Sequence, residues 1–209
     1  MNILEGKNPG FELSTDRIQA LADGIFAFAM TLLVVNLSFP DEVDQTNVAN
    51  LSKLLYSQMH RFFNYALSFL LLSIFWIVHH QQFHVIKRSD PRLLWINIFI
   101  LMFVALMPFS TDLVGDFSQT IEAKVFFAGN MLILGSLFLV NWAYATGNHR
   151  LVNPDMEKDA IARGIKRNLI SPAVSLLVIT ISFFIPHYSL YFYLLIPVIQ
   201  ALPWFRRVG

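Results

Sequence analysis

Six long apolar runs dominate this sequence and restrict what it can fold into. Each approaches the roughly 20 apolar residues that an α-helix needs to cross a bilayer. Short stretches rich in charge or proline separate them, and we place the runs at 18–39, 62–83, 93–114, 125–146, 169–185 and 190–205. Only 14% of the residues are charged, against roughly 25% in soluble domains. We therefore expect an all-α integral membrane protein whose residues 1–209 form one domain of six transmembrane helices.

Lysine and arginine gather on one side of this six-span arrangement. Of the 15 such residues, three (Lys53, Arg61 and Lys124) fall on one side. The other twelve fall on the side of the N-terminus, the second and fourth connections and the C-terminus. Because these residues are enriched in cytoplasmic loops, we expect a multi-pass protein of the cell membrane with both termini in the cytoplasm.

The residues available exclude or weaken several kinds of chemistry. The chain has no cysteine, which excludes disulfides, thiolate metal sites and a cysteine nucleophile. His80 and His84 lie one helical turn apart, a spacing that suits haem or metal ligation, but no companion cluster of acids or histidines stands in the other runs. No basic run indicates nucleic acid. We expect no enzymatic activity, cofactor or bound metal.

Asp23 lies more than one turn inside the first run, where an unpaired charge costs ~2.5–3.5 kcal/mol. Arg17 is six positions away and so falls on a different face of the helix, which makes a partner on another helix the better candidate. His79 and His80 stand near the same end of the second run, and Asn97 lies at similar depth in the third. Asp23 either fixes helix packing or binds a cation, as it would in a small secondary transporter.

A second face of the first run is almost entirely apolar. At about 100° per residue, Phe28, Thr31, Leu32 and Val35 fall within one arc of the helix, separate from the arc that holds Asp23. This face offers one hydroxyl among bulky apolar groups. An isolated threonine in a span usually bonds its own backbone or packs against a neighbour, so residue chemistry alone does not assign Thr31 a role.

These segments resemble a family of potassium channels related to the endolysosomal channel called transmembrane protein 175. The family's first-helix signature is arginine, three variable residues and then Phe-Ser-Asp. Here Arg17 is followed at the same spacing by Leu21-Ala22-Asp23, so two positions of the triplet differ. Residues 75–80, 92–97 and 103–109 also look like the family pattern.

The resemblance implies a prokaryotic single-repeat member that assembles as a homotetramer around a central pore lined by the first helix. The family's pore constriction falls at Phe28, Leu32 and Val35, where an aromatic at the narrowest point is unusual, and its selectivity position falls at Thr31. A motif and packing network would comprise Arg17, Asp23, Trp76, His79, His80 and Asn97.

We accordingly expect a potassium-selective channel of modest selectivity, with a hydrophobic constriction in the first helix. Its partners would be its own copies, the lipid bilayer and monovalent cations. The alternatives are a secondary transporter that uses Asp23, a membrane-bound haem or metal enzyme that uses His80 and His84, and a packing protein without transport.

Overall fold

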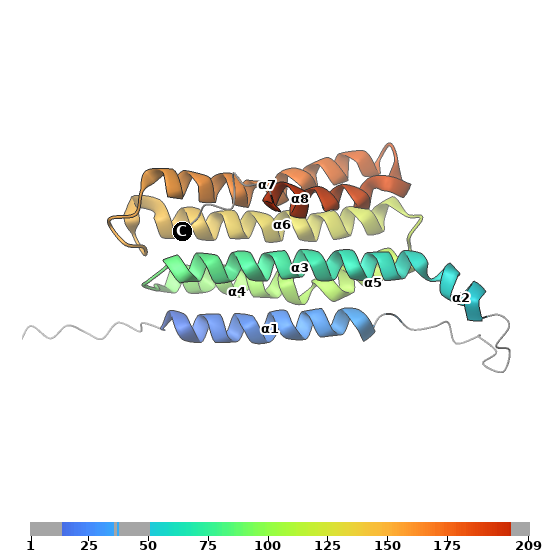
Figure 1. The fold of residues 1–209 in the computed structure, drawn as a ribbon, viewed down its shortest axis with the longest axis horizontal. Coiled ribbons are helices and arrows are strands. Elements are labelled where there is room, and N and C mark those ends of the chain that lie inside the picture. Colours follow the sequence, from blue (N-terminus) through green and yellow to red (C-terminus); the bar gives the residue numbers. More distant parts are fainter. Residues whose placement is uncertain (1–13, 36, 38–50, 202–209) are drawn as a thin grey trace, which may run out of the picture.

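The computed structural model describes residues 14–35, 37 and 51–201, and these residues form helices joined by short connections (Figure 1). The long helices run side by side, up and down one elongated bundle. The elements are α1 (Thr15–Val35), α2 (Leu51–Ser57), α3 (Met59–Val85), α4 (Pro91–Ala105), α5 (Met107–Asp116), α6 (Ile121–Thr146), the 3-10 helix η2 (Gly147–His149), α7 (Lys158–Ser182), the 3-10 helix η3 (Pro186–Leu194) and α8 (Leu195–Ala201).

Five stretches of the described residues are long and apolar enough to cross a membrane: Thr15–Val35, Met59–Val85, Pro91–Asp116, Ile121–His149 and Lys158–Ser182. They match the first five predicted runs. The fifth begins eleven residues earlier than predicted, because the polar residues from 158 to 168 continue the helix without a break.

The sixth predicted run, 190–205, is described only to residue 201. There it consists of the end of η3 followed by the short α8, which return along α7 (Figure 1). Residues 202–205 lie outside the described part. A six-span subunit therefore stays a prediction at its last helix.

The third span is interrupted near Pro108. Helix α4 ends at Ala105 and α5 begins at Met107, with Pro108 in the first turn of α5. Proline lacks the N–H that an interior helical residue donates, but an N–H in the first turn has no helical acceptor in any case. At the other end of the span, Pro91 again stands in the first turn, and Asp90 caps the helix by accepting from the Leu93 N–H at 2.8 Å.

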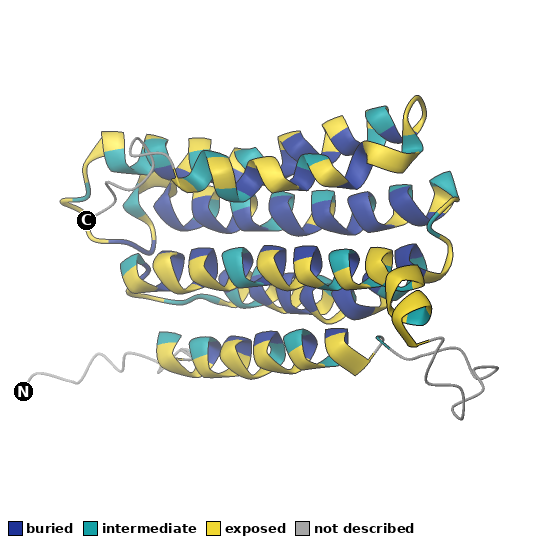
Figure 2. Ribbon diagram, turned by 45° about the vertical axis from the view of Figure 1, so that its right-hand side comes forward, coloured by how far each residue is buried: buried dark blue, intermediate teal, exposed yellow. Residues whose placement is uncertain are grey.

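Helix α1 packs on the bundle by a single stripe. Its buried residues recur at the three- and four-residue spacing of one helical face, and they are Ile18, Ala22, Phe26, Ala29 and Leu33. They contact α3, α4 and α5. Within the most apolar 18 residues of each span, 28% are buried in α1 and 50% in the span of α6. Figure 2 shows this contrast, with α1 exposed along the side turned away from the other helices.

Helices α6 and α7 approach each other more closely than side chains with a Cβ would allow at two positions. A Cβ added at Gly164 would lie 2.3 Å from Cε2 of the Trp142 indole. One added at Gly135 would lie 2.8 Å from the Ser171 hydroxyl oxygen. Small residues that let helix backbones approach closely are typical of packing within membranes, and here they fix the α6–α7 pair.

The two ends of the bundle differ in charge. The start of α1, the α3–α4 turn and the α6–α7 connection lie at one end (Figure 1). Nine of the twelve cations assigned to one side are described. All nine lie in these segments, in the first turn of α4 or in the first ten residues of α7: Arg17, Lys87, Arg88, Arg92, Arg150, Lys158, Arg163, Lys166 and Arg167. Lys53, Arg61 and Lys124 lie on the elements at the opposite end. The lysine and arginine residues that the sequence assigns to opposite sides therefore lie at opposite ends of the bundle, for the residues that the structure describes.

Candidate functional site

The face of α1 that the sequence singled out is uncovered in the subunit. Phe28 is 64% exposed and Val35 is 67% exposed. Thr31 is also exposed, and Leu32 is half-buried at the edge of the face. These side chains lie on a different part of the helix surface from the stripe that packs on the bundle. We call Phe28, Thr31, Leu32 and Val35 the outer face of α1.

The Thr31 hydroxyl is already engaged within its own helix. It donates to the Phe28 carbonyl oxygen at 2.8 Å, the local bond that threonine commonly makes in membrane helices. A hydroxyl oxygen has two lone pairs and can still accept when its proton is donated. The outer face therefore presents one oxygen acceptor, with its proton fixed, among apolar side chains.

Asp23 has its partner on α3. The Trp76 Nε1–H donates to the Asp23 carboxylate oxygen Oδ1 at 2.8 Å. The His80 ring stacks near the Trp76 ring, with 6.1 Å between centroids. The sequence placed Trp76 near this end of α3 but favoured a histidine as the partner of Asp23. The indole N–H takes that role because it projects toward α1 from a partly exposed position.

His79 faces the interior instead. Its Nε2 lies 2.8 Å from Asn97 Oδ1 on α4, and both side chains are buried. The His79 ring stacks on Phe83 with centroids 4.5 Å apart, and Phe26 of α1 lies 6.1 Å away. With Asn97 Oδ1 as the acceptor, Nε2–H is the donor. His79 therefore ties α3 to α4 directly beneath α1.

The remaining predicted site residues stand apart. Arg17 is exposed in the first turn of α1, and no hydrogen bond or ion pair joins it to Asp23 in the described structure. His80 and His84 are both exposed. Within residues 14–35, 37 and 51–201 no three histidine, aspartate or glutamate side chains converge as metal ligands would.

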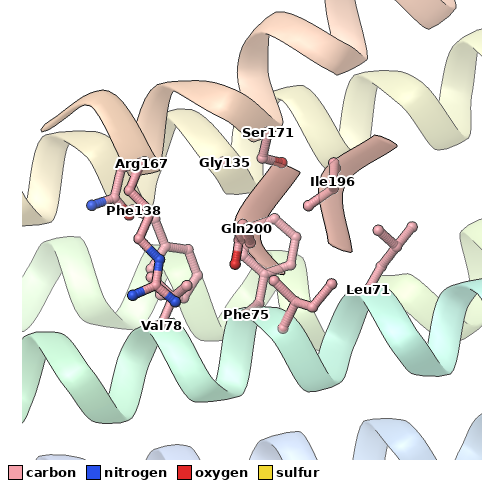
Figure 3. A pocket seen from close by; sticks show the side chains of 11 residues that line it. Leu71, Phe75, Val78, Gly135, Phe138, Arg167, Ser171, Ile196 and Gln200 are labelled. Carbon is pink, nitrogen blue, oxygen red and sulfur yellow. The ribbon is translucent and has the colours of Figure 1, made fainter. Parts of the chain in front are cut away.

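A buried amide cluster was not singled out from the sequence. Asn141 Nδ2 donates to Gln82 Oε1 at 2.7 Å, and Gln82 Nε2 donates to Asn168 Oδ1 at 3.0 Å. The cluster joins α3, α6 and α7, and all three side chains are buried. The available signal was two isolated amides within apolar runs, Gln82 and Asn141, with Asn168 directly before the fifth run, but the sequence did not show that they meet. Beside the cluster lies a cavity bounded by α3, α6, α7 and α8 (Figure 3).

Comparisons with known proteins give a consistent result. Residues 17–108 match the family model described as the endosomal/lysosomal potassium channel TMEM175. A potassium channel of Chamaesiphon minutus is 29% identical over 172 residues, which cover 81% of this chain and 84% of that protein. A potassium channel of a Chryseobacterium species is 28% identical over 194 residues, covering 91% of this chain and 94% of that protein.

Longer relatives match over a smaller share. The endosomal/lysosomal proton channel TMEM175 of Gallus gallus is 28% identical over 112 residues, which are 51% of this chain but 22% of that protein. The fold is shared with the crystal structure of a lysosomal potassium-selective channel TMEM175 homologue from Chamaesiphon minutus, at a TM-score of 0.78 and 24% identity, covering 90% of this chain and 98% of that one.

Proposed function

We propose that the chain is a member of the TMEM175 potassium channel family, of the single-repeat prokaryotic kind, and that it conducts potassium across a cell membrane. The observation that carries the proposal is the outer face of α1, where Phe28 and Val35 stand about two-thirds exposed. A helix that packs by one stripe only leaves its other side for lipid or for further copies of the chain. Four copies around an axis would bring four outer faces together.

In such a homotetramer the apolar side chains of α1 form successive rings along the axis. Phe28, Leu32 and Val35 supply them, and rings of this kind close a pore by excluding water and therefore ions. Opening requires the four α1 helices to move apart. The modest packing of α1 on its own subunit favours such movement.

Thr31 is the proposed source of selectivity. Its hydroxyl oxygen stays free to accept while its proton is held by the Phe28 carbonyl, so a ring of four such oxygens would face the ion. Potassium gives up hydration water more readily than sodium and is favoured in a narrow, weakly polar passage. No acidic side chain belongs to the outer face, so we expect modest selectivity among monovalent cations. No cofactor enters this mechanism, and the proposed role is transport rather than catalysis.

The secondary transporter that would use Asp23 is not favoured. The carboxylate accepts from Trp76 and lies off the outer face. The relatives matched over most of the chain are named as channels.

Flux into liposomes tests the proposal directly. The purified protein, reconstituted alone, should pass potassium and caesium faster than sodium, and the rate should rise linearly with the ion gradient as in a pore. A saturable flux that needs a second, coupled ion would support the transporter instead. Protein-free liposomes set the background.

The pairing of Asp23 with Trp76 supports a role in holding the helices in register for assembly. Asp23→Asn should weaken the bond by about 1 kcal/mol, since a neutral amide oxygen accepts less strongly than a carboxylate. Trp76→Phe removes the donor and should act in the same direction. We expect both variants to yield a smaller tetramer fraction in size-exclusion chromatography with light scattering. A fully tetrameric Asp23→Asn channel altered only in ion selectivity would place Asp23 in the ion path.

We propose that the end of the bundle rich in lysine and arginine faces the cytoplasm, with both termini on that side. The charge segregation between the two ends supports this, as such residues are retained in cytoplasmic loops. Reporter fusions at residues 209 and 45 should report opposite sides of the membrane, the former cytoplasmic. A result that puts both on one side would overturn the six-span map.

A further inference from the structure

A small cavity lies behind the end of α1, between that helix, α3 and α5. Leu33 and Leu37 of α1 form an apolar wall, and polar side chains that include Asn64 of α3 and Asp112 of α5 line the rest. Leu33 belongs to the buried stripe that packs on the bundle, so the cavity is on the side of α1 turned away from the outer face. It has room for one ion or one water molecule and for nothing larger.

Asp112 brings a carboxylate without a protein partner to this cavity. It lies four residues before the end of α5 (Met107–Asp116), about 6 Å inside along the helix axis. It makes no hydrogen bond or ion pair with the residues that the structure describes. A carboxylate inside a membrane helix is costly unless a cation or water satisfies it.

The cationic side chains nearby do not neutralise Asp112. Arg61 also borders the cavity, but its guanidinium pairs with Asp116, one turn beyond Asp112 on the same face of α5. The ring nitrogens of His60 lie 3.1 and 3.2 Å from backbone carbonyl oxygens instead. Two carboxylates and one guanidinium leave one negative charge at the cavity.

Asn64 is an independent sign that a ligand belongs there. Its side chain is 8% exposed and makes no hydrogen bond in the part of the chain that the structure describes, although most buried side-chain amides are hydrogen-bonded. Its amide atoms are not sealed off by protein. Thr111, which also lines the cavity, is satisfied by Ser68 and by the Met107 carbonyl oxygen. Asn64 therefore offers a free amide oxygen at the cavity that Asp112 lines.

Carboxylate and amide oxygens are hard ligands, which suit alkali and alkaline-earth cations. The single excess charge favours a monovalent ion. A divalent metal is disfavoured because no three acidic or histidine side chains converge in the described residues. Sodium and potassium ions without their hydration shells are no larger than a water molecule, so either can enter. A water molecule would fit as well, but it would leave the charge of Asp112 uncompensated.

We propose that this cavity binds one alkali cation, held by the Asp112 carboxylate and the Asn64 amide oxygen. Each copy of the chain would have its own site, behind α1 and away from the pore proposed for the outer face. The bound ion would join α3 to α5 beneath the end of α1.

Thallium(I) locates such a site directly, because it substitutes for alkali cations and scatters X-rays anomalously. Crystals of the full-length protein soaked in a thallium salt should show an anomalous peak between Asp112 and Asn64. Asp112→Asn should abolish the peak. Glu122→Gln is the matched control, since Glu122 is an exposed carboxylate at the same end of the bundle, in the first turn of α6, and the peak should stay. Peaks on a symmetry axis would bear on the channel proposal alone.

Thermal unfolding in detergent gives a second measurement. At constant ionic strength, sodium or potassium chloride should raise the midpoint by roughly 3 °C over choline chloride. The rise should vanish in Asp112→Asn and persist in Glu122→Gln. Should Asp112→Asn fail to fold, Asn64→Leu keeps the carboxylate and the approximate size of the side chain. It should raise the cation concentration needed for half of the shift by about tenfold.

Three results would overturn the proposal. Electron density in the cavity without an anomalous signal would identify a water molecule. An anomalous peak that persists in Asp112→Asn would show that the carboxylate does not hold the ion. Equal midpoints in alkali and choline salts would show that no alkali cation stabilises the fold.

Discussion

Phe28→Ala is expected to raise basal potassium flux through reconstituted channels by roughly tenfold, the effect of removing about 1.4 kcal/mol from the barrier to ion passage. Phe28 is 64% exposed on the outer face of α1, and truncation there removes no contact of the subunit core. If four such rings converge in the tetramer, they exclude water by their size and apolarity. Smaller side chains would leave a wider, wetted passage. Discrimination between potassium and sodium should fall at the same time, because a wider passage strips less hydration water.

Val34→Ala is the matched control for this experiment. Val34 is 51% exposed and lies about 120° around the helix from Phe28, so its truncation shortens an exposed apolar side chain of α1 without touching the proposed constriction. Its flux should match the wild type. Unchanged flux and selectivity in Phe28→Ala would contradict the assignment and move the constriction to Leu32 or Val35. If Phe28 only packs between subunits, Phe28→Ala should reduce the tetramer fraction and should not raise potassium flux.

Gly164→Ala is expected to destabilise the folded protein by ~1–3 kcal/mol, the range for adding a methyl group to a filled core. The new Cβ would lie 2.3 to 2.5 Å from three atoms of the Trp142 indole. That indole is buried, and its Nε1–H donates to the Ile161 carbonyl oxygen at 3.1 Å. The ring therefore has no free direction in which to move without losing that bond. Thermal unfolding in detergent should show a lower midpoint, by roughly 2–4 °C for each kcal/mol.

Two further variants separate this clash from a general effect of alanine. Gly129 lies on α6 with nothing within 4 Å of an added Cβ, so Gly129→Ala should leave the midpoint unchanged or raise it slightly. In a Trp142→Phe background the smaller ring removes the obstacle, and Gly164→Ala should then cost much less than it does alone. Additive losses in the double variant would show that Gly164 is needed for another reason.

The transmembrane helices were largely predictable because a backbone in the hydrocarbon core must make its N–H and C=O hydrogen bonds internally, and a helix does so within one segment. Runs of apolar residues between charged connections therefore located five spans to within a few residues, except at the start of α7. The error there has a physical cause. Residues 158–168 are polar, so hydropathy placed the start of the fifth apolar run only at residue 169, yet Gly164 packs on Trp142 and Asn168 joins the amide cluster. Packing, which hydropathy does not describe, extends the helix.

The candidate site was predictable to the level of helix faces and no further. Spacing alone separated the outer face of α1 from the side that holds Asp23. Spacing did not predict the partner of Asp23. Trp76, His79 and His80 lie within one five-residue stretch of α3 and differ only in the direction in which their side chains project from the helix. In the structure, Trp76 turns to Asp23, and His79 turns inward to Asn97. Likewise, no pattern along the chain brings Gln82, Asn141 and Asn168 together, because they meet through the packing of three helices.

The bond between Asp23 and Trp76 also bears on how the chain is made. Helix α1 is synthesised before α3, so Asp23 enters the membrane while the residue that will donate to it is still to be translated. During that interval the carboxylate lacks the Trp76 indole N–H that donates to it in the folded chain. Asp23 is the ninth residue of α1 (Thr15–Val35), about 12 Å from the first residue along the axis, which keeps it within reach of the headgroup region when the helix shifts or tilts.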